Sequence, residues 1–427
     1  MTTSSPEKRS KYFINVEAEN ALKWAKSGKS FFITGPAGSG KSVLLKNIRD
    51  ELSPFKKVAV TAPTGISAEN VLGQTIHSFS GINLFNPQEK PKSIEQRIRK
   101  HKTGVLTVSR WRNTDVLIID ECSMISGEMF DVLDYLGKQF REEENEYFGG
   151  MQVIVIGDFY QLEPIKSSYL FQSKIFQEMF IDTKQYICLT HIYRQQDPLF
   201  LNGLNDMRLG ILNEEFLSKI QENNRKWNEQ TQDIVPTKLY CRNEDVERCN
   251  IYELSKLRTE KFTFKAIDRI YKSNYPKQFI TFPVDDSIDV KVGAQIMFLK
   301  NTDDYKNGTR GVITEINEED KMITVKLRNE TILNVSPVVF EIKKNDDLVA
   351  TRRMFPFKLA WAISIHKSQS LTESWLEVNL NGVFQPAQAY VALSRATSMD
   401  GLYVIGLKKD GVYCNPLVVE FYNKLNV

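Results

Sequence analysis

Short apolar runs in the first half of the chain predict buried β-strands. Three of them are Phe31–Ile33, Val116–Ile119 and Gln152–Ile156, and the pattern of Val43–Leu52 is that of a helix. Strand and helix patterns alternate in this way from residue 1 to about 190. Such alternation is typical of α/β folds, in which helices flank a mostly parallel sheet. The first half of the chain is therefore predicted to adopt this fold.

A different pattern occupies residues 263 to 351. Short stretches there alternate apolar and polar residues and are bounded by Asn, Asp and Gly. They are Val292–Leu299, Gly311–Ile316, Met322–Leu327 and Thr331–Val335. Alternation with a period of two, interrupted by turn residues, is typical of antiparallel strands. This segment is predicted to form a small antiparallel barrel.

The first predicted strand leads directly into a glycine-rich loop that a helix follows. The loop residues are Gly35, Pro36, Ala37, Gly38, Ser39, Gly40, Lys41 and Ser42. The glycines let the backbone curl so that its N–H groups converge on phosphate oxygens, and the helix N-terminus faces the same anion. Lys41 is predicted to reach the β- and γ-phosphates, and Ser42 to offer a hydroxyl to Mg²⁺. The motif indicates a nucleoside triphosphate as ligand.

The next two predicted strands end in polar residues that suit the rest of a nucleotide site. Asp120 and Glu121 follow one strand, and Gln161 follows the other. Ligands lie at the carboxyl ends of strands in an open α/β sheet. These side chains are therefore predicted to lie near the glycine-rich loop, which is a phosphate-binding P-loop. Asp120 would hold Mg²⁺, Glu121 would orient or deprotonate the attacking water, and Gln161 would sense the γ-phosphate or position water.

Composition narrows the class of protein but does not decide its function. The chain has 427 residues, 41% of them hydrophobic and 26% charged, which is long enough for several globular domains. Five cysteines without a C-x-x-C pair and only four histidines argue against a zinc module or a disulfide framework. A net charge of +3 argues neither for nor against nucleic-acid binding. No apolar run is long enough to span a membrane and no signal core precedes the first strand, so we expect a soluble protein in a reducing compartment.

Several further segments resemble the motifs of one helicase family. Thr61–Gly65 and Gly73–Phe79 resemble the motif through which superfamily 1 helicases touch single-stranded DNA. Met124–Asp134 and Phe148–Pro164 are similar to the signature of the petite-integration-frequency (Pif-type) DNA helicases, RecD-like members of superfamily 1B. Other motifs follow in the order of that family, at Ile192–Gln195, Val292–Gln295, Asn307–Gly311, Leu359–Gln369 and Ala389–Ala396. The resemblance covers nearly the whole chain.

The resemblance implies a division into domains. Residues 1–190 would form a first RecA-like P-loop domain with an insertion at about 80–110 that acts as a wedge at the fork. Residues 191–262 and 352–427 would form a second RecA-like domain, and 263–351 an inserted SH3-like β-barrel. The expected fold class is thus α/β, with two RecA-like domains of parallel sheet flanked by helices.

The resemblance also implies roles for two arginines and for a DNA track. Arg194 and Arg395 would neutralise transition-state charge on the γ-phosphate. The residues expected to contact DNA are Pro63, Thr64, His77 and Phe79 in the first domain and His366, Lys367 and Thr372 in the second. Structural alternatives stay open, because either arginine could form an ordinary ion pair and His77, Phe79 or His366 could be buried packing residues.

Three positions depart from the family pattern. Ala18 stands where a glutamine usually reads the adenine edge, so adenine preference is in question, and Tyr193 could compensate by stacking on the base. Glu163 stands where proline is common, and this affects the turn after Gln161. Ser370 replaces the glycine usual after Lys-Ser-Gln.

The motifs together predict an ATP-dependent helicase that uses ATP and Mg²⁺. From the resemblance we expect 5′ to 3′ translocation on single-stranded DNA and unwinding of forked or tailed duplexes, with G-quadruplexes and RNA–DNA hybrids as further substrates of the family. The alternatives are a nucleotide-gated clamp or translocase on single-stranded DNA that does not separate strands, and a small-molecule kinase. We expect a monomer without membrane association, in the cytoplasm of a bacterial or virus-infected cell and close to the nucleoid.

Overall fold

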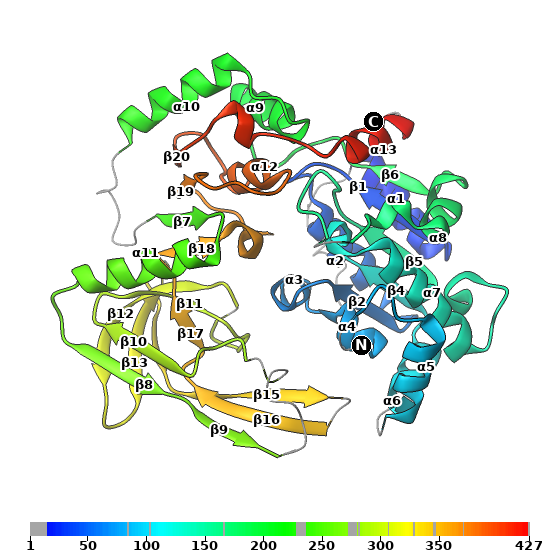
Figure 1. Cartoon of the computed structure of the whole chain (residues 1–427), viewed down its shortest axis with the longest axis horizontal. Coiled ribbons are helices and arrows are strands. Elements are labelled where there is room, and N and C mark those ends of the chain that lie inside the picture. Colours follow the sequence, from blue (N-terminus) through cyan, green and yellow to red (C-terminus); the bar gives the residue numbers. More distant parts are fainter. Residues whose placement is uncertain are drawn as a thin grey trace, which may run out of the picture. The chain divides into compact units, whose positions relative to one another are not determined.

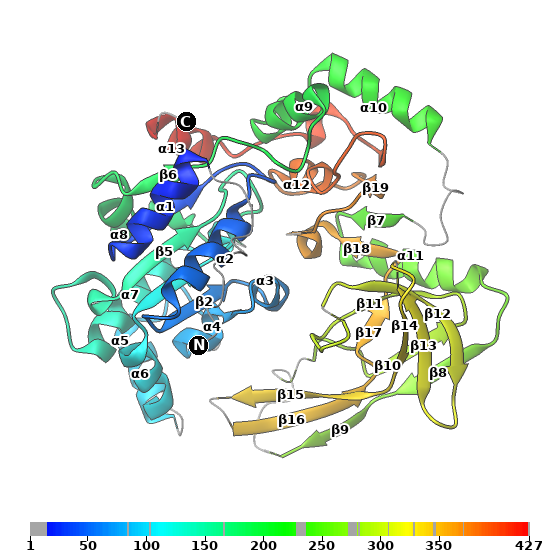
Figure 2. The ribbon, with the colours of Figure 1, turned by 180° about the vertical axis from the view of Figure 1, so that it is seen from behind.

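The chain folds into two compact units, seen from two sides in Figures 1 and 2. The first unit contains the chain up to Gln96, Val108–Arg194 and the C-terminal segment that begins at Pro416, and the second contains Arg97–Thr107 and Gln195–Asn415. The computed structural model describes residues 15–82, 85–101, 104–164, 167–227, 236–271, 280, 282–305, 307–327, 329–344, 347–369 and 371–425.

A six-stranded sheet forms the centre of the first unit, and every neighbouring pair in its order β3-β2-β4-β5-β1-β6 is parallel. Its strands are β1 (Phe31–Thr34), β2 (Val58–Ala62), β3 (Gln74–Thr75), β4 (Val116–Ile119), β5 (Gln152–Ile156) and β6 (Tyr186–Cys188). The three apolar runs predicted as strands are confirmed as β1, β4 and β5, which are buried throughout. Because β5 pairs with both β1 and β4, the carboxyl ends of these three strands lie at one edge of the sheet.

Helices accompany the sheet of the first unit. They are α1 (Val16–Lys26), α2 (Lys41–Leu52), α3 (Gly65–Asn70), α4 (Ile76–Ser80), α5 (Pro91–Lys100), α6 (Gly104–Asn113), α7 (Gly127–Arg141), α8 (Lys174–Phe176) and α13 (Pro416–Lys424). Two of them, α5 and α6, extend into the stretch Arg97–Thr107 that belongs to the second unit. Figure 2 shows α1 and α2 side by side over one face, where Ala21, Leu45 and Ile48 pack against Phe31 and Ile33. The predicted parallel sheet flanked by helices is confirmed.

The opposite face of the sheet carries an aromatic cluster that includes the C-terminal helix. Side chains alternate along a strand, so Phe32 points away from Phe31 and Ile33. The Phe32 ring lies 5.5 Å from that of Phe159, which lies 5.3 Å from the ring of Phe421 on α13. The sequence-based division assigned residues 352–427 to the second RecA-like domain, whereas the segment from Pro416 packs in the first unit. The buried Phe421 is the physical reason for this difference.

The second unit contains a parallel sheet of its own. Its order is β18-β7-β19-β20, made of β7 (Thr237–Tyr240), β18 (Ala362–Ser364), β19 (Leu376–Asn379) and β20 (Leu402–Ile405). The accompanying helices are α9 (Pro198–Arg208), α10 (Glu214–Lys226), α11 (Asn243–Lys256) and α12 (Gln388–Leu393). On α10, the Asn223 amide donates to the carbonyls of Met399 and Leu402, which fixes this helix against β20.

The part of the second unit between Lys261 and Leu359 forms antiparallel sheets. One has the order β14-β13-β12-β11-β17, another β15-β16-β9, and a third pairs β8 with β10. The strands are β8 (Lys261–Lys265), β9 (Ile267–Ile270), β10 (Ser287–Lys291), β11 (Gln295–Phe298), β12 (Arg310–Asn317), β13 (Met322–Leu327), β14 (Ile332–Val335), β15 (Val338–Lys344), β16 (Asp347–Met354) and β17 (Phe357–Leu359). The four stretches predicted as strands are confirmed as β11 to β14. Strand β17 pairs with β11 although it lies beyond the predicted barrel limit at 351.

The segment at 80–110, expected as an insertion, consists largely of α5 and α6. Ile94 and Ile98 are buried, whereas Arg99 and Lys100 are exposed, so the basic residues lie on the solvent side of an amphipathic helix. No helix within the described ranges is long and apolar enough to cross a membrane.

We predict that Phe130→Ala destabilises the first unit strongly. The Phe130 ring is fully buried and lies 5.1 Å from that of Phe148 and 6.0 Å from that of Phe176. Loss of such a side chain costs about 3–5 kcal/mol of unfolding free energy, measurable by urea denaturation. Phe55→Ala is the matched control, because Phe55 is 88% exposed and its loss is expected to change stability by less than about 0.5 kcal/mol. Equal effects of the two substitutions would contradict this description of the core.

Candidate nucleotide site and DNA-contact residues

The glycine-rich loop connects β1 to α2 in a conformation that needs its glycines. Gly38 and Gly40 have φ angles of +81° and +86°, in the left-handed region that favours glycine. A Cβ on Gly35 would lie 2.6 Å from the carbonyl oxygen of Leu189, so β6 and the loop approach too closely for a side chain. The Ser39 hydroxyl is buried and has no hydrogen-bond partner within the described part of the chain, which suits a loop that receives a phosphate.

Lys41 begins α2 and folds back over the loop. Its ammonium donates to the carbonyl oxygens of Gly35 at 2.7 Å and Pro36 at 2.9 Å. The positive charge is thereby held at the loop where phosphate oxygens would bind, and the same charge acts on Asp120. Ser42, the next residue, is exposed at the first turn of the helix. The sequence-predicted pair of lysine and hydroxyl therefore lies at the helix N-terminus, as a P-loop requires.

Asp120 and Glu121 directly follow β4 and are both buried. Burial and the neighbouring Glu121 carboxylate raise the pKa of Asp120 to about 7, while the Lys41 ammonium acts in the opposite direction. Glu121 has a φ angle of +48°, an unusual backbone conformation for a residue with a side chain. The next residue, Cys122, has a thiol pKa raised well above its usual value by burial and by the nearby carboxylates.

The turn after β5 adds a second buried polar group. Gln161 is buried, and its Nε2 donates to Asp158 Oδ2 at 3.4 Å. The Tyr160 amide donates to Asp158 Oδ1 at 3.1 Å, so Asp158 organises the turn that carries Gln161. Glu163, one of the three departures from the family pattern, accepts a hydrogen bond from the Tyr169 hydroxyl. Sequence analysis had assigned no role to Asp158.

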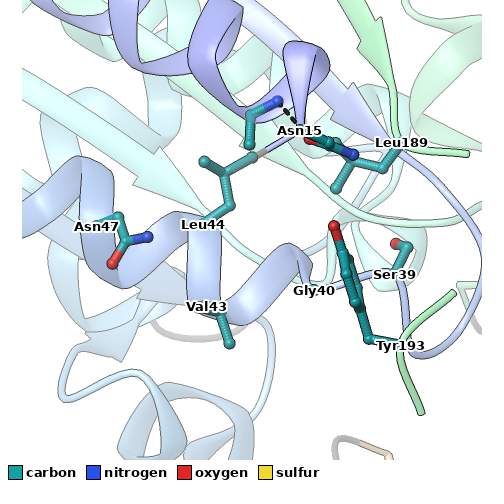
Figure 3. A pocket seen from close by; sticks show the side chains of 9 residues that line it. Asn15, Ser39, Gly40, Val43, Leu44, Asn47, Leu189 and Tyr193 are labelled. Carbon is teal, nitrogen blue, oxygen red and sulfur yellow. Dashed lines mark hydrogen bonds between the residues drawn. The ribbon is translucent and has the colours of Figure 1, made fainter. Parts of the chain in front are cut away.

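An open pocket lies beside the P-loop, and its lining suits a nucleobase. It holds about 300 Å³, part of it open to solvent, and is lined by Asn15, Ala18, Ser39, Gly40, Val43, Leu44, Asn47, Leu189 and Tyr193. Figure 3 shows the Tyr193 ring on one side and the α2 residues Leu44 and Asn47 on the other. Asn15 caps α1 by accepting from the Ala18 amide at 2.8 Å. Ala18 thus lines the pocket but offers it only a methyl group.

Tyr193 is anchored to the P-loop through its backbone. Its amide donates to the Gly38 carbonyl at 2.9 Å, and its ring would lie 3.6 Å from a Cβ on Gly40. The exposed His191 ring meets the Tyr193 ring edge to face at 4.3 Å. Tyr193 is half-buried with one face on the pocket, so its predicted stacking on a base is compatible with this geometry. His191 and Asn15 are pocket neighbours that sequence analysis did not identify.

The two predicted arginine fingers differ in their surroundings. Arg194 is half-buried at the end of the first unit. Arg395, in the second unit, is only 2% exposed, and its guanidinium donates to the Val391 carbonyl at 2.8 Å and to the Ser394 hydroxyl at 3.0 Å. Its backbone carbonyl accepts from the Glu373 amide at 2.9 Å. The C-terminal end of α12 therefore binds the Arg395 side chain, which is buried and does not lie on the surface.

The predicted DNA residues of the first unit fall into two groups. Pro63 and Thr64 are half-buried at the end of β2, where the Thr64 hydroxyl accepts from the Ser67 amide and caps α3. His77 is half-buried, and desolvation lowers the pKa of its imidazole. Phe79 is fully buried with its ring 5.0 Å from that of Trp111. The packing alternative therefore holds for Phe79, whose ring has no face free for a base.

The predicted DNA residues of the second unit lie closer to its surface. His366 is half-buried, its Nε2 lies 2.8 Å from Gln385 Oε1, and Lys367 and Thr372 are exposed. The ring of Phe384, 47% exposed, stacks near that of His366 at 6.2 Å. Sequence analysis overlooked Phe384, because an isolated aromatic residue gives no signal without its neighbours in space. Ser370 lies outside the described residues.

Comparison with protein families gives a clear match over the first half of the chain. Residues 12–214 match the family model described as PIF1-like helicase. The chain is 35% identical over 426 residues to the ATP-dependent DNA helicase PIF1 of Xenopus laevis, a match that covers 96% of this chain and 64% of that protein. The chain thus spans less than two thirds of that relative's length. It is 32% identical to the ATP-dependent DNA helicase Pif1 of Bdellovibrio bacteriovorus, covering 96% of this chain and 92% of the relative.

Solved structures of Pif1 helicases match the fold of nearly the whole chain. A crystal structure of Pif1 helicase from Candida albicans superimposes with a TM-score of 0.87 at 33% identity, covering 97% of this chain and 99% of the other. A Bacteroides Pif1 in complex with ADP-AlF3 and single-stranded DNA has a TM-score of 0.76 at 27% identity, with 97% of each chain covered. The P-loop, the carboxylates that follow β4 and the matches over nearly all of both partners lead to one conclusion: this chain belongs to the PIF1-like helicase family.

Proposed function

We propose that the protein is an ATP-dependent DNA helicase. One observation carries the proposal: Lys41, Asp120 and Gln161 follow β1, β4 and β5, neighbouring strands of one parallel sheet whose carboxyl ends lie at one edge. Family membership adds that relatives with the same arrangement are named ATP-dependent DNA helicases. A small-molecule kinase would share the P-loop, but it would have no use for the second unit with its own parallel sheet.

The nucleotide would occupy the P-loop and the adjoining pocket. The backbone of Gly35 to Gly40, with Ser39, would hold the phosphates, and the base would enter between Tyr193 and α2. Lys41 would exchange its bonds to the Gly35 and Pro36 carbonyls for bonds to phosphate oxygens. The Bacteroides relative, whose structure is a complex with ADP-AlF3, supports a nucleotide as the ligand.

The oxygen atoms near the P-loop suit Mg²⁺ as a metal ion. The Ser42 hydroxyl and the Asp120 carboxylate supply hard oxygen ligands, and no group of three or more His, Cys, Asp or Glu residues in the described ranges forms a metal cage. That donor set suits an ion which takes one or two protein ligands and completes its shell with phosphate oxygens and water. When bound, Mg²⁺ would neutralise charge on the β- and γ-phosphates.

The remaining groups of the site have roles in hydrolysis. Glu121 would accept the proton of the attacking water, and Gln161 would report the state of the γ-phosphate through its turn. Arg194 and Arg395 would complete the charge compensation on the γ-phosphate. Glu121 and Gln161 are buried, which strengthens electrostatic interactions with the transferred group.

Single-stranded DNA is the proposed track, and forked or tailed duplexes are the proposed substrates. Pro63, Thr64 and His77 in the first unit and His366, Lys367 and Thr372 in the second are the proposed contacts, through stacking and phosphate binding without sequence readout. The Bacteroides relative, whose structure is a complex with single-stranded DNA, supports single-stranded DNA as the track. Movement from 5′ to 3′ and a monomeric state are part of the proposal and rest on the resemblance to the family.

The proposed domain organisation follows the two units. The sheet around β1 forms a first RecA-like domain that includes the C-terminal helix α13, and the sheet around β7 forms the second. The antiparallel strands β11 to β14 and β17 form the SH3-like insertion, and the helices α5 and α6 form the wedge.

We predict that Glu121→Gln separates binding from turnover. The amide keeps the shape of the carboxylate but accepts no proton, so kcat for ATP hydrolysis should fall by about 100-fold or more, while ATP binding stays near the wild-type level. DNA-stimulated phosphate release and equilibrium binding of a fluorescent ATP analogue measure the two quantities. Lys41→Ala is the control that should lose hydrolysis as well. A Glu121→Gln protein with normal turnover would remove Glu121 from the role of base.

We also predict that Ala18→Gln sharpens base selectivity. A glutamine at this position would line the pocket and could exchange two hydrogen bonds with the adenine edge. The ratio of kcat/KM for ATP to that for GTP should rise roughly 30-fold, since two such bonds of roughly 1 kcal/mol each contribute roughly 2 kcal/mol. Asn20→Gln is the matched control, because Asn20 is exposed on the same helix and does not line the pocket. An unchanged ratio in Ala18→Gln would exclude this pocket as the base site.

A further inference from the structure

Tyr422, on the C-terminal helix α13, lies at the junction of two parts of the nucleotide site. Its hydroxyl is 2.6 Å from the Thr34 hydroxyl, and Thr34 is the last residue of β1, directly before the P-loop. The same hydroxyl accepts from the Phe159 amide at 3.1 Å and donates to Asp158 Oδ1 at 3.4 Å. All of these residues are fully or almost fully buried. One phenol group thus bridges the end of β1 and the turn after β5.

The phenol group makes three hydrogen bonds to the described residues. A tyrosine hydroxyl has one donor and two acceptor positions. The carboxylate of Asp158 can only accept and the Phe159 amide can only donate, so the remaining acceptor position falls to the Thr34 hydroxyl as donor. A group satisfied in all three positions has one orientation, and a phenylalanine could not replace these bonds.

The bridge continues to Gln161. Asp158 Oδ1 also accepts from the Tyr160 amide, and Asp158 Oδ2 accepts from Gln161 Nε2 at 3.4 Å. At the other end, the Thr34 carbonyl accepts from the Leu189 amide at 2.8 Å, which holds the entry to the P-loop against β6. A continuous set of buried bonds therefore joins the start of the phosphate loop to the proposed γ-phosphate sensor.

The tyrosine ring is held independently of its hydroxyl. It stacks on the Tyr160 ring at 4.6 Å with an angle of 14° between the planes, and the adjacent Phe421 stacks on Phe171 at 4.5 Å. The aromatic contacts anchor α13, whereas the hydroxyl reaches the polar groups near the nucleotide site. The two contributions can therefore be separated by removing the oxygen alone.

We propose that Tyr422 is a positioning residue that aligns the P-loop with the Asp158–Gln161 turn through its hydroxyl. The inference rests on the proposed ATP hydrolysis and adds a residue to it from a segment nearly 400 positions from the P-loop. Without the oxygen, the Thr34 hydroxyl and Asp158 lose their shared partner, and Gln161 loses the fixed orientation of the carboxylate that it contacts. Hydrolysis would then slow because the group next to the γ-phosphate is misplaced.

Tyr422→Phe tests this directly, because the ring and its stacking remain. We expect kcat for DNA-stimulated ATP hydrolysis to fall about tenfold with little change in KM for ATP, since small displacements of a positioned group can cost up to about 100-fold in rate. Thr34→Val should give a similar loss, Thr34→Ser should stay near wild type because it keeps the hydroxyl, and Tyr422→Phe combined with Thr34→Val should lose no more than either alone. Amide hydrogen exchange of residues 157–161 should rise in Tyr422→Phe.

Tyr186→Phe is the matched control. Its half-buried hydroxyl donates to the Leu425 carbonyl at 3.5 Å, so it also ties the C-terminal segment to the sheet, but among the residues that the structure describes it makes no hydrogen bond to the P-loop or to Asp158. Equal kcat values for Tyr422→Phe and wild type, or equal losses in Tyr422→Phe and Tyr186→Phe, would overturn the positioning role. A wild-type chain without ATPase activity would instead refute the proposed function, and hydrogen exchange of residues 157–161 would then decide the role of the hydroxyl.

Discussion

The hydrogen-bonded order of three parallel strands, β4-β5-β1, is the constraint on which the rest of the site depends. Residues far apart in the sequence reach one edge of the sheet because each strand runs in the same direction and ends at the same level. Strand β1 delivers the phosphate loop, β4 delivers Asp120 and Glu121, and β5 delivers the turn with Gln161. A change in the register of β5 would separate the lysine from the carboxylates, so the buried apolar runs matter for chemistry as much as for stability.

Burial of charge is the second feature of this edge. Asp120 lies beneath the surface with its pKa raised to about 7 by burial and by Glu121, and the nearby Lys41 partly offsets this. Such a group of charges is poorly compensated in the protein alone. A divalent cation would supply the missing positive charge beside the two carboxylates, so we infer that binding of the cation relieves an electrostatic cost that folding leaves in place. The glycine backbone of the loop and the buried Ser39 hydroxyl are arranged so that they can bind an anion.

Much of this architecture is predictable from the sequence, because its signals are local. The runs that became β1, β4 and β5 are buried and apolar, and the P-loop carries its glycines at the positions where φ is positive. The strands β11 to β14 were predictable from alternation and turn residues. These features depend on neighbouring residues along the chain, and a single sequence contains that information.

Features that depend on distant contacts were not predictable in the same way. The segment from Pro416 was expected in the second RecA-like domain, but Phe421 and Tyr422 pack on the sheet of the first unit, and nothing local in the sequence indicates which sheet they cover. The burial of Phe79 against Trp111 has the same cause, since an aromatic residue in a DNA-binding motif has the same local pattern whether it packs inward or faces a base. Asp158 and Phe384 escaped notice because their roles depend on partners in space.

The central claim is that the nucleotide site drives strand separation with a fixed direction. Its most direct test compares two matched DNA duplexes, one with a 5′ single-stranded tail and one with a 3′ tail, incubated with the protein, ATP and Mg²⁺ and followed by release of the labelled strand. The account predicts release from the 5′-tailed duplex alone, and none with Lys41→Ala. Release from the 3′-tailed duplex alone would contradict the direction, and DNA-stimulated hydrolysis without release from either duplex would contradict strand separation itself.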